Sequence, residues 1–189
     1  MHGLTSSSAD FVNRGPERSL AYILADAGYD VWLANAHGNT FLRNHTTLDP
    51  VMDAEKFYDF TWHEIRYYII GAIDYILNLS GDNSLYYIGN SQGTTAFLVL
   101  ASSRPEFNAK IRIASLMAPA AILQHYPSIF IQTLCKYIDQ VELILKKWKI
   151  YEILYVKEIR DGVSALCTDP NSSHICDVLY DLLLSGDGG

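Results

Sequence analysis

The sequence predicts an α/β fold, in which parallel strands carry helices on their faces, and three observations lead to this prediction. Apolar, β-rich runs alternate along the chain with segments whose apolar residues recur at helical spacing. The pentapeptide Gly89-Asn90-Ser91-Gln92-Gly93 stands between one such run and one such segment. The 189 residues, 49% of them hydrophobic, suffice for one sizeable core. Such alternation is typical of a parallel sheet, because each parallel connection needs a crossover, usually a helix.

The first quarter of the chain contains a turn, a helix and a strand. It begins with His2-Gly3-Leu4, a glycine-bearing turn followed by hydroxyl side chains. Residues 16–27 have helical periodicity, with a proline suited to the first turn and Gly28 placed to end the helix. Residues 29–34 are β-rich and predict a short buried strand, which ends at the turn residues 35–39.

The middle of the chain carries the clearest pattern. Apolar residues between 61 and 79 follow the i, i+3, i+4, i+7 spacing over several turns and predict a long helix, which residues 81–83 interrupt. Residues 85–88 predict a strand, residues 94–101 a helix and residues 110–117 another strand. We therefore expect a core domain over residues 1–120.

Residues 121–189 have a different texture and predict a helical insertion. Residues 129–134 and 141–154 are long apolar and aromatic stretches with helical spacing and without alternating strands. They could form a lid that shelters an apolar substrate, or helices that cover the sheet. The pattern alone favours the covering helices, because apolar stripes on helices usually belong to a core.

The pentapeptide suits a nucleophilic serine. A serine hydroxyl is a weak nucleophile that a strained strand-to-helix turn can present to a base, and glycine two residues to either side of Ser91 leaves space for that turn. The helix that follows directs free N–H groups at a developing oxyanion. The alternative is an ordinary turn in which Ser91 caps the helix, and the strand before and helix after favour the nucleophile.

Composition excludes several other classes. The net charge is −7, and the largest basic cluster is Lys146-Lys147-Trp148-Lys149, so we expect no nucleic-acid partner. That cluster could touch a lipid surface through Trp148, although a solvated helix face is the favoured interpretation. Neither a transmembrane segment nor a signal peptide is expected within this chain. Histidines and cysteines do not have metal-ligand spacing, and no cofactor is expected.

The sequence resembles the gastric and lysosomal acid lipases, a family of α/β-hydrolases, along nearly its whole length. The segments that carry the resemblance are His2-Gly3-Leu4, residues 24–33, Gly38-Asn39 and residues 91–95. It implies an incomplete α/β-hydrolase fold with the start of a helical cap from about Pro119. It also implies that Ser91 is the nucleophile and that the backbone N–H groups of Gln92 and Leu4 form the oxyanion hole.

Three departures from the family pattern stand out. Asn90 replaces a histidine before the nucleophile, and His37 replaces the arginine of the NxRGN turn; neither change removes the chemistry. The family's catalytic Asp and His follow the cap, and neither is expected in this chain, which by resemblance lacks the N-terminal strands and the C-terminal part. A local base is the alternative: His174 follows Ser91, and three aspartates lie between them, Asp139, Asp161 and Asp169. We interpret His174 as a solvated surface residue, and His63 and His125 as surface or packing residues.

Cysteines and sequons bear on the compartment. By resemblance Cys167 and Cys176 match the spacing of a lid disulfide, and we interpret Cys135 as a buried free thiol. Three residues stand in glycosylation sequons: Asn44, Asn78 and Asn171. Together with the family's habit they favour a secreted or lysosomal parent protein.

Two functions follow from the resemblance. The favoured one is a lipase-like ester hydrolase that acts on acylglycerols or sterol esters, at a lipid–water interface, through a Ser91 acyl-enzyme. The alternative is a catalytically inactive truncated lipase or pseudo-enzyme.

Overall fold

A computed structural model describes residues 1–122, 128–152, 157–170, 172 and 174–176. The chain divides into two compact units, Met1–Ala121 and Ile122–Gly189, which are described one at a time. The candidate site lies in the first unit.

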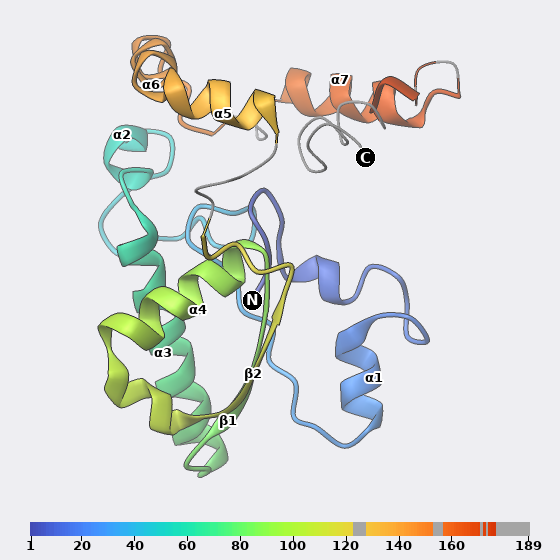
Figure 1. Cartoon of the computed structure of the whole chain (residues 1–189), viewed down its shortest axis with the longest axis vertical. Helices are drawn as coiled ribbons and strands as arrows, with labels where there is room; N and C mark the ends of the chain where they lie inside the picture. Colours follow the sequence, from blue (N-terminus) through green and yellow to red (C-terminus); the bar gives the residue numbers. More distant parts are fainter. Residues whose placement is uncertain (123–127, 153–156, 171, 173, 177–189) are drawn as a thin grey trace. The chain divides into compact units, whose positions relative to one another are not determined.

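The described part of the first unit contains two parallel strands joined through a helix. Strand β1, Leu85–Asn90, pairs in parallel with β2, Ile111–Met117, and their connection runs through α4, Gln92–Ser103, and a 3-10 helix, Pro105–Lys110. In Figure 1, α3 and α4 lie on one side of the strands and α1 lies on the other. The predicted α/β architecture with parallel strands is therefore confirmed, because the crossover helix packs on the sheet.

Helix α3, Trp62–Ser80, confirms the most periodic prediction. Its start is fixed by a capping box, in which the Thr61 side chain accepts the His63 N–H and the Glu64 carboxylate accepts the Thr61 N–H. Its end is fixed by Gly81, whose φ of 77° is accessible to glycine at little cost. The core that it forms with β1, α4 and the 3-10 helix consists of Ile65, Ile69, Ile73, Tyr87, Ala96, Phe97, Leu100 and Phe107.

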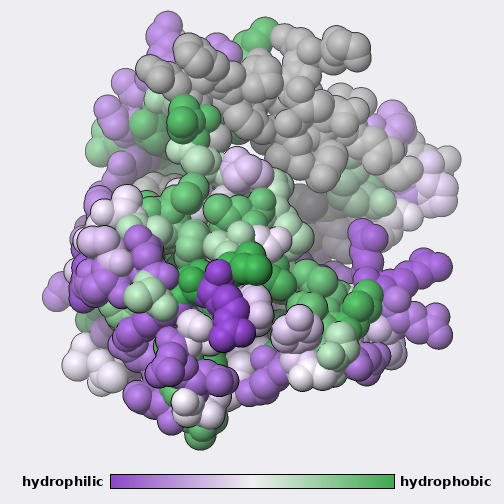
Figure 2. Space-filling view, turned by 60° about the horizontal axis from the view of Figure 1, so that its bottom comes forward, coloured by the Kyte–Doolittle hydropathy of each residue, from purple (hydrophilic) through white to green (hydrophobic). Residues whose placement is uncertain are grey.

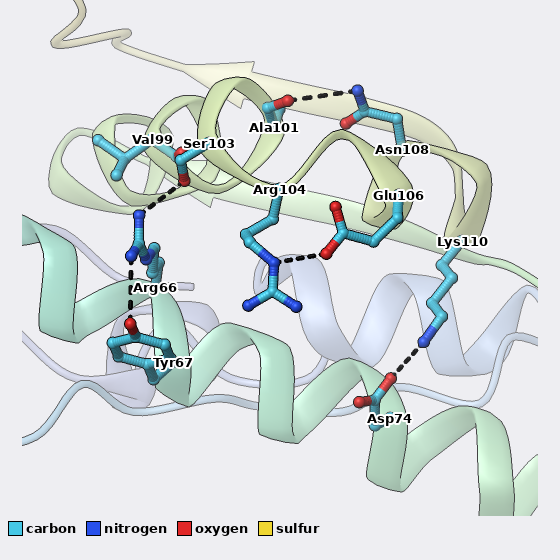
Figure 3. A network of polar contacts seen from close by, with 10 residues as sticks. All are labelled: Arg66, Tyr67, Asp74, Val99, Ala101, Ser103, Arg104, Glu106, Asn108 and Lys110. Carbon is cyan, nitrogen blue, oxygen red and sulfur yellow. Dashed lines mark hydrogen bonds and ion pairs between the residues drawn. The ribbon is translucent and has the colours of Figure 1, made fainter.

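Polar side chains join α3 to the crossover helices at the surface (Figure 3). Arg66 donates to Ser103 at 2.8 Å, and Lys110 pairs with Asp74 at 2.6 Å. The side chains of Lys110 and Asp74 are about 40% exposed, so water screens their charges and the ion pair adds little to stability. These two contacts join α3 to the end of α4 and to the 3-10 helix that follows it.

Residues 29–34 were predicted as a buried strand, and this prediction is wrong. They run without regular secondary structure and most of them are exposed, including Trp32 at 42%. A strand requires a hydrogen-bonded neighbour, and in the part of the chain that the structure describes the sheet contains β1 and β2 alone. A groove lies between β1 and this segment.

Three short elements complete the described part of the first unit. Helix α1 spans Leu20–Asp26, so it begins four residues later than the periodicity predicted, although Gly28 ends it as expected with a φ of 89°. A 3-10 helix, Ser8–Phe11, and helix α2, Ala54–Phe57, were not predicted, because four residues are too few to show a period.

The second unit is helical where it is described. It contains α5, Ile129–Lys136, α6, Ile138–Lys147, and α7, Lys157–Thr168. The helix predicted over residues 141–154 ends at Lys147, because Lys149 adopts a φ of 57° that no helix can continue; residues 153 and 154 lie outside the described residues.

The cysteines of the second unit differ in state. Cys167 and Cys176 are joined by a disulfide across a sequence separation of 9 residues. Cys135 is free, but it is exposed, so the expectation of a buried thiol is wrong. It lies on α5, where the neighbouring Gln132, Thr133 and Lys136 are exposed as well.

Candidate functional site

Ser91 lies on a strained turn between β1 and α4. Its backbone has a φ of 47° and a ψ of −111°, a conformation that costs a residue with a side chain about 1–3 kcal/mol. Two long-range hydrogen bonds hold the turn. The Asn90 N–H donates to the carbonyl oxygen of Met1 at 3.0 Å, and the Ser91 N–H donates to the carbonyl oxygen of Met117 at 3.0 Å. Such strain persists only where the surroundings impose it, and it is typical of functional residues.

The two glycines of the pentapeptide lie where backbone atoms come too close to leave space for a side chain. A Cβ atom on Gly93 would lie 2.5 Å from the Met1 carbonyl oxygen, and one on Gly89 would lie 2.9 Å from the backbone of Gly93. No side chain fits at either distance, because both neighbours are backbone atoms. The spacing of glycine, serine and glycine is thus a consequence of β1, the turn and α4 approaching closely.

The Ser91 hydroxyl is not used as a helix cap. Ser91 occupies the position before the first residue of α4, yet its side chain makes no capping hydrogen bond. Within the described part of the chain its carbonyl does accept from the backbone and hydroxyl of Thr94, at 2.8 Å and 2.6 Å. The turn therefore satisfies the backbone and leaves the hydroxyl available, as a nucleophile requires.

The turn His2-Gly3-Leu4 lies against Ser91. A Cβ atom on Gly3 would lie 3.3 Å from the Ser91 Cβ. The next residue, Leu4, is 62% exposed, and Thr5 has a φ of 60°. The backbone of the turn and the N-terminus of α4, which begins at Gln92, therefore approach Ser91 from two directions.

A buried histidine that the sequence analysis did not single out fixes this turn. His2 is 2% exposed; its Nε2 accepts the Ala36 N–H at 2.9 Å, and its Nδ1 lies 2.8 Å from the Gly3 carbonyl oxygen. Because Nε2 accepts, the proton lies on Nδ1, which donates to Gly3. Burial lowers the pKa of His2, which favours this neutral form.

Asparagines extend this contact to the neighbouring turn. The Asn39 amide lies 3.1 Å from the His2 Nε2 and donates to Asn35 at 2.7 Å; Asn35 also accepts the Ser8 N–H at 2.9 Å. Both nitrogens of His2 are therefore occupied, so His2 orients the turn and is not free to take a proton from Ser91. The only sequence signal for this role is that a histidine immediately precedes the glycine of the turn.

The base predicted as an alternative is not brought to Ser91 by any hydrogen bond among the described residues. His63 is exposed on α3. His174 is exposed in the second unit, and His125 lies outside the described residues. The aspartates Asp139, Asp161 and Asp169 belong to the second unit. In the ranges that the structure describes, the turn that carries Ser91 therefore has no histidine hydrogen-bonded to its serine.

The two substituted family positions have structural surroundings. His37 is buried, its Nε2 lies 2.9 Å from the Phe57 carbonyl oxygen, and its ring stacks on Tyr68 with centroids 5.4 Å apart. Asn90 faces the turn, and its side-chain amide nitrogen would lie 3.5 Å from a Cβ atom placed on Gly3. His37 is thus held by a hydrogen bond and by ring stacking, and Asn90 lies beside the turn that carries Ser91.

The described ranges hold neither a metal-ligand cluster nor a membrane-spanning helix. In the described ranges no three His, Cys, Asp or Glu side chains lie together as metal ligands would. The helices in those ranges are too short or too polar to cross a membrane. Two of the sequon asparagines, Asn44 and Asn78, are exposed, whereas Asn171 lies outside the described residues.

Comparison with known proteins agrees with this geometry. Residues 1–138 match the family model for the alpha/beta hydrolase fold. "Lipase 1" of Drosophila melanogaster is 55% identical over 120 residues, which are 63% of this chain and 27% of that protein. Gastric triacylglycerol lipase of Bos taurus is 38% identical over 68% of this chain and 32% of its own length. "Lipase member M" of Homo sapiens is 34% identical over 98% of this chain and 43% of its own length. The chain therefore spans less than half the length of these relatives.

Proposed function

Because this chain belongs to the α/β-hydrolase fold family, as an acid-lipase-like member, we propose that Ser91 forms an acyl-enzyme with a lipid ester. The observation that supports this most directly is the conformation of Ser91. Its φ of 47° is imposed by the contacts of Met1, Met117 and the two glycines, and its hydroxyl caps nothing in the described part of the chain. A merely structural turn gains nothing from that strain.

The proposed first step is attack of the Ser91 Oγ on the ester carbonyl carbon. The carbonyl oxygen becomes negative, and the backbone N–H groups of Gln92 and Leu4 would stabilise it. Gln92 is suited to this because it begins α4, whose first N–H groups have no partner within the helix. Leu4 is suited because His2 and Gly3 hold its turn against Ser91.

A base must receive the Ser91 proton, and none of the described histidines is hydrogen-bonded to it. We propose that the Asp and His of the triad come from residues other than those of this chain, in the remainder of a lipase of full length. By this proposal the 189 residues alone hydrolyse esters too slowly to detect, because loss of triad function in serine hydrolases lowers kcat about 10⁶-fold. An inactive lipase fragment is the second candidate, and the same missing base favours it.

The substrate class proposed is acylglycerols or sterol esters. The support is the bovine relative, which is named as a triacylglycerol lipase. The second unit, with exposed Leu143, Ile144 and Trp148, would act as the cap that meets a lipid surface. A secreted or lysosomal location, with glycans at the exposed Asn44 and Asn78, completes the proposal.

Hydrolysis of a short-chain nitrophenyl ester tests the function. The proteins are this chain and a chimera in which the unmatched segments of Drosophila melanogaster "Lipase 1" flank it. We expect no activity above background from the chain and clear turnover from the chimera. Ser91→Ala should abolish turnover, whereas Ser102→Ala, an exposed serine of α4, should leave it unchanged. A folded chimera without esterase activity would favour the inactive fragment.

A further inference from the structure

Thr94 holds the carbonyl oxygen of Ser91 through its backbone and through its side chain. The Thr94 N–H donates to this oxygen at 2.8 Å, and the Thr94 hydroxyl donates to it at 2.6 Å. The Thr95 N–H donates to it as well, at 3.4 Å. The two N–H bonds belong to the first turn of α4 and need no particular side chain, because every residue except proline has a backbone N–H. The hydroxyl bond depends on the side chain at position 94.

The Thr94 hydroxyl is buried, and it bonds two backbone groups. Hydrophilic residues border the apolar centre of the face in Figure 2 and meet water there. Thr94 is instead 0% exposed, so its hydroxyl depends on partners within the protein. It accepts the Ala120 N–H at 3.0 Å and donates to the Ser91 carbonyl oxygen. Because an N–H can only donate and a carbonyl can only accept, the hydroxyl proton lies toward Ser91.

The chain that leaves β2 returns to α4 at this point. Met117, the last residue of β2, accepts the Ser91 N–H, and the next residue, Ala118, has a φ of 45°. A φ in this left-handed region is uncommon for a residue with a side chain. After this turn Ala120 lies against α4, where the Thr95 hydroxyl donates to its carbonyl oxygen at 2.6 Å. Two adjacent threonines therefore hold the two polar groups of Ala120, and the first of them also bonds Ser91 through its hydroxyl.

The Ser91 carbonyl and the Gln92 N–H belong to one peptide group. A peptide group is planar and trans, so its C=O and its N–H point in opposite directions. Any contact that fixes the Ser91 carbonyl therefore fixes the direction of the Gln92 N–H. That N–H has no acceptor within α4, because Gln92 is the first residue of the helix. A donor to an oxyanion must lie about 3 Å from the oxygen on which charge develops, so its direction matters for the rate.

We propose that Thr94 is a positioning residue for ester hydrolysis, whose hydroxyl holds the Ser91 carbonyl and thereby directs the Gln92 N–H at the oxyanion. This inference rests on the function proposed above, which assigns that role to Gln92. Thr94 acts through the Ser91–Gln92 peptide and not on the ester, because its side chain is fully buried. Without the hydroxyl, the strained conformation of Ser91, with a φ of 47° and a ψ of −111°, loses a contact that imposes it.

The test compares Thr94→Val with Thr95→Val in the chimera that carries the segments of "Lipase 1". Valine has nearly the shape of threonine but lacks the hydroxyl. Each variant leaves one polar group of Ala120 without its threonine partner, and Thr94→Val alone removes a bond to Ser91. For a short-chain nitrophenyl ester, we expect kcat to fall about 10–100-fold in Thr94→Val at an unchanged KM, because the lost interaction acts in the transition state.

The controls separate the hydroxyl from packing. Thr95→Val and Thr94→Ser, which keeps the hydroxyl, should both retain kcat within about threefold. If Thr94→Val does not fold, Thr94→Ala and Thr94→Ser make the same comparison, because they differ from each other by the hydroxyl alone.

A second readout needs no activity and uses the full chain labelled with ¹⁵N. The order parameter of the Gln92 N–H should be about 0.85 in the parent chain and in Thr95→Val, and it should fall below about 0.6 in Thr94→Val. A merely structural role of Thr94 would lower stability without this local change at Gln92.

Two results would overturn the proposal. One is equal kcat and equal Gln92 order parameters in the two valine variants. The other is a loss of kcat/KM in Thr94→Val that comes entirely from a higher KM, since this would assign Thr94 to substrate binding. If the parent chimera hydrolyses no ester, the function proposed above fails. The order parameter then decides on Thr94 alone, and a rigid Gln92 in Thr94→Val would refute the positioning role.

Discussion

Acetylating the amine of Met1 should stabilise the chain, and the gain should depend on pH. The amine is buried where it bonds Ile88, and burial lowers its pKa from 8.0 to about 6. Between these two values the unfolded chain binds a proton that the folded chain does not, so stability falls as pH decreases from 8 to 6. Acetylation removes the charge but keeps an N–H that can donate to Ile88.

The magnitude follows from the shift of two pKa units. Each unit corresponds to roughly 1.4 kcal/mol, so acetylation should raise the free energy of unfolding by about 3 kcal/mol below pH 6. The gain in the free energy of unfolding should be about half as large at pH 7 and close to zero at pH 9. Urea unfolding of the free and acetylated chains at pH 5, 7 and 9 measures it. A gain independent of pH, or none at pH 5, would refute the burial of a charge at this position.

Three further predictions concern the turn and the disulfide. Gly93→Ala should lower the free energy of unfolding by about 1–3 kcal/mol because its Cβ would strike backbone, whereas Gly71→Ala, with open space around it in α3, should raise it by about 0.5–1 kcal/mol; urea titrations compare them. His2→Ala should lower the free energy of unfolding by about 1–3 kcal/mol at pH 8, because it removes the acceptor of the buried Ala36 N–H. Because the pKa of His2 is lowered in the folded chain, the parent protein should lose stability as the pH falls below 6.5, the ordinary pKa of histidine, and the variant should not show this loss. Equal pH profiles of stability for both proteins would contradict this. Cys167→Ser should destabilise the second unit by about 2–3 kcal/mol, while Cys135→Ser should not, and protease susceptibility reports the difference.

Local signals explain why α3 and the serine turn could be predicted from the sequence. Thr61 and Gly81 mark the ends of α3, and its period continues through the 19 residues between them. The pentapeptide is likewise local, because its glycines and Ser91 meet within one turn. Both depend on residues close in sequence, so they can be recognised without knowledge of the tertiary structure.

The sequence-based predictions failed where the outcome depends on contacts between residues that are far apart in the sequence. Residues 29–34 have strand composition, but a strand forms only beside a partner, and composition does not report one. The role of His2 depends on Ala36 and Asn39, more than 30 residues away. The exposure of Cys135 depends on which face of α5 is covered, which a short apolar helix does not reveal.

Mapping a fluorophosphonate adduct tests the central claim most directly. The chimera with "Lipase 1" segments is treated with the reagent, digested and analysed by mass spectrometry. The account predicts one stoichiometric adduct, on the peptide that contains Ser91, and its loss in Ser91→Ala together with a fall in kcat of about 10⁶-fold. An adduct on another serine, or ester hydrolysis that persists in Ser91→Ala, would contradict it.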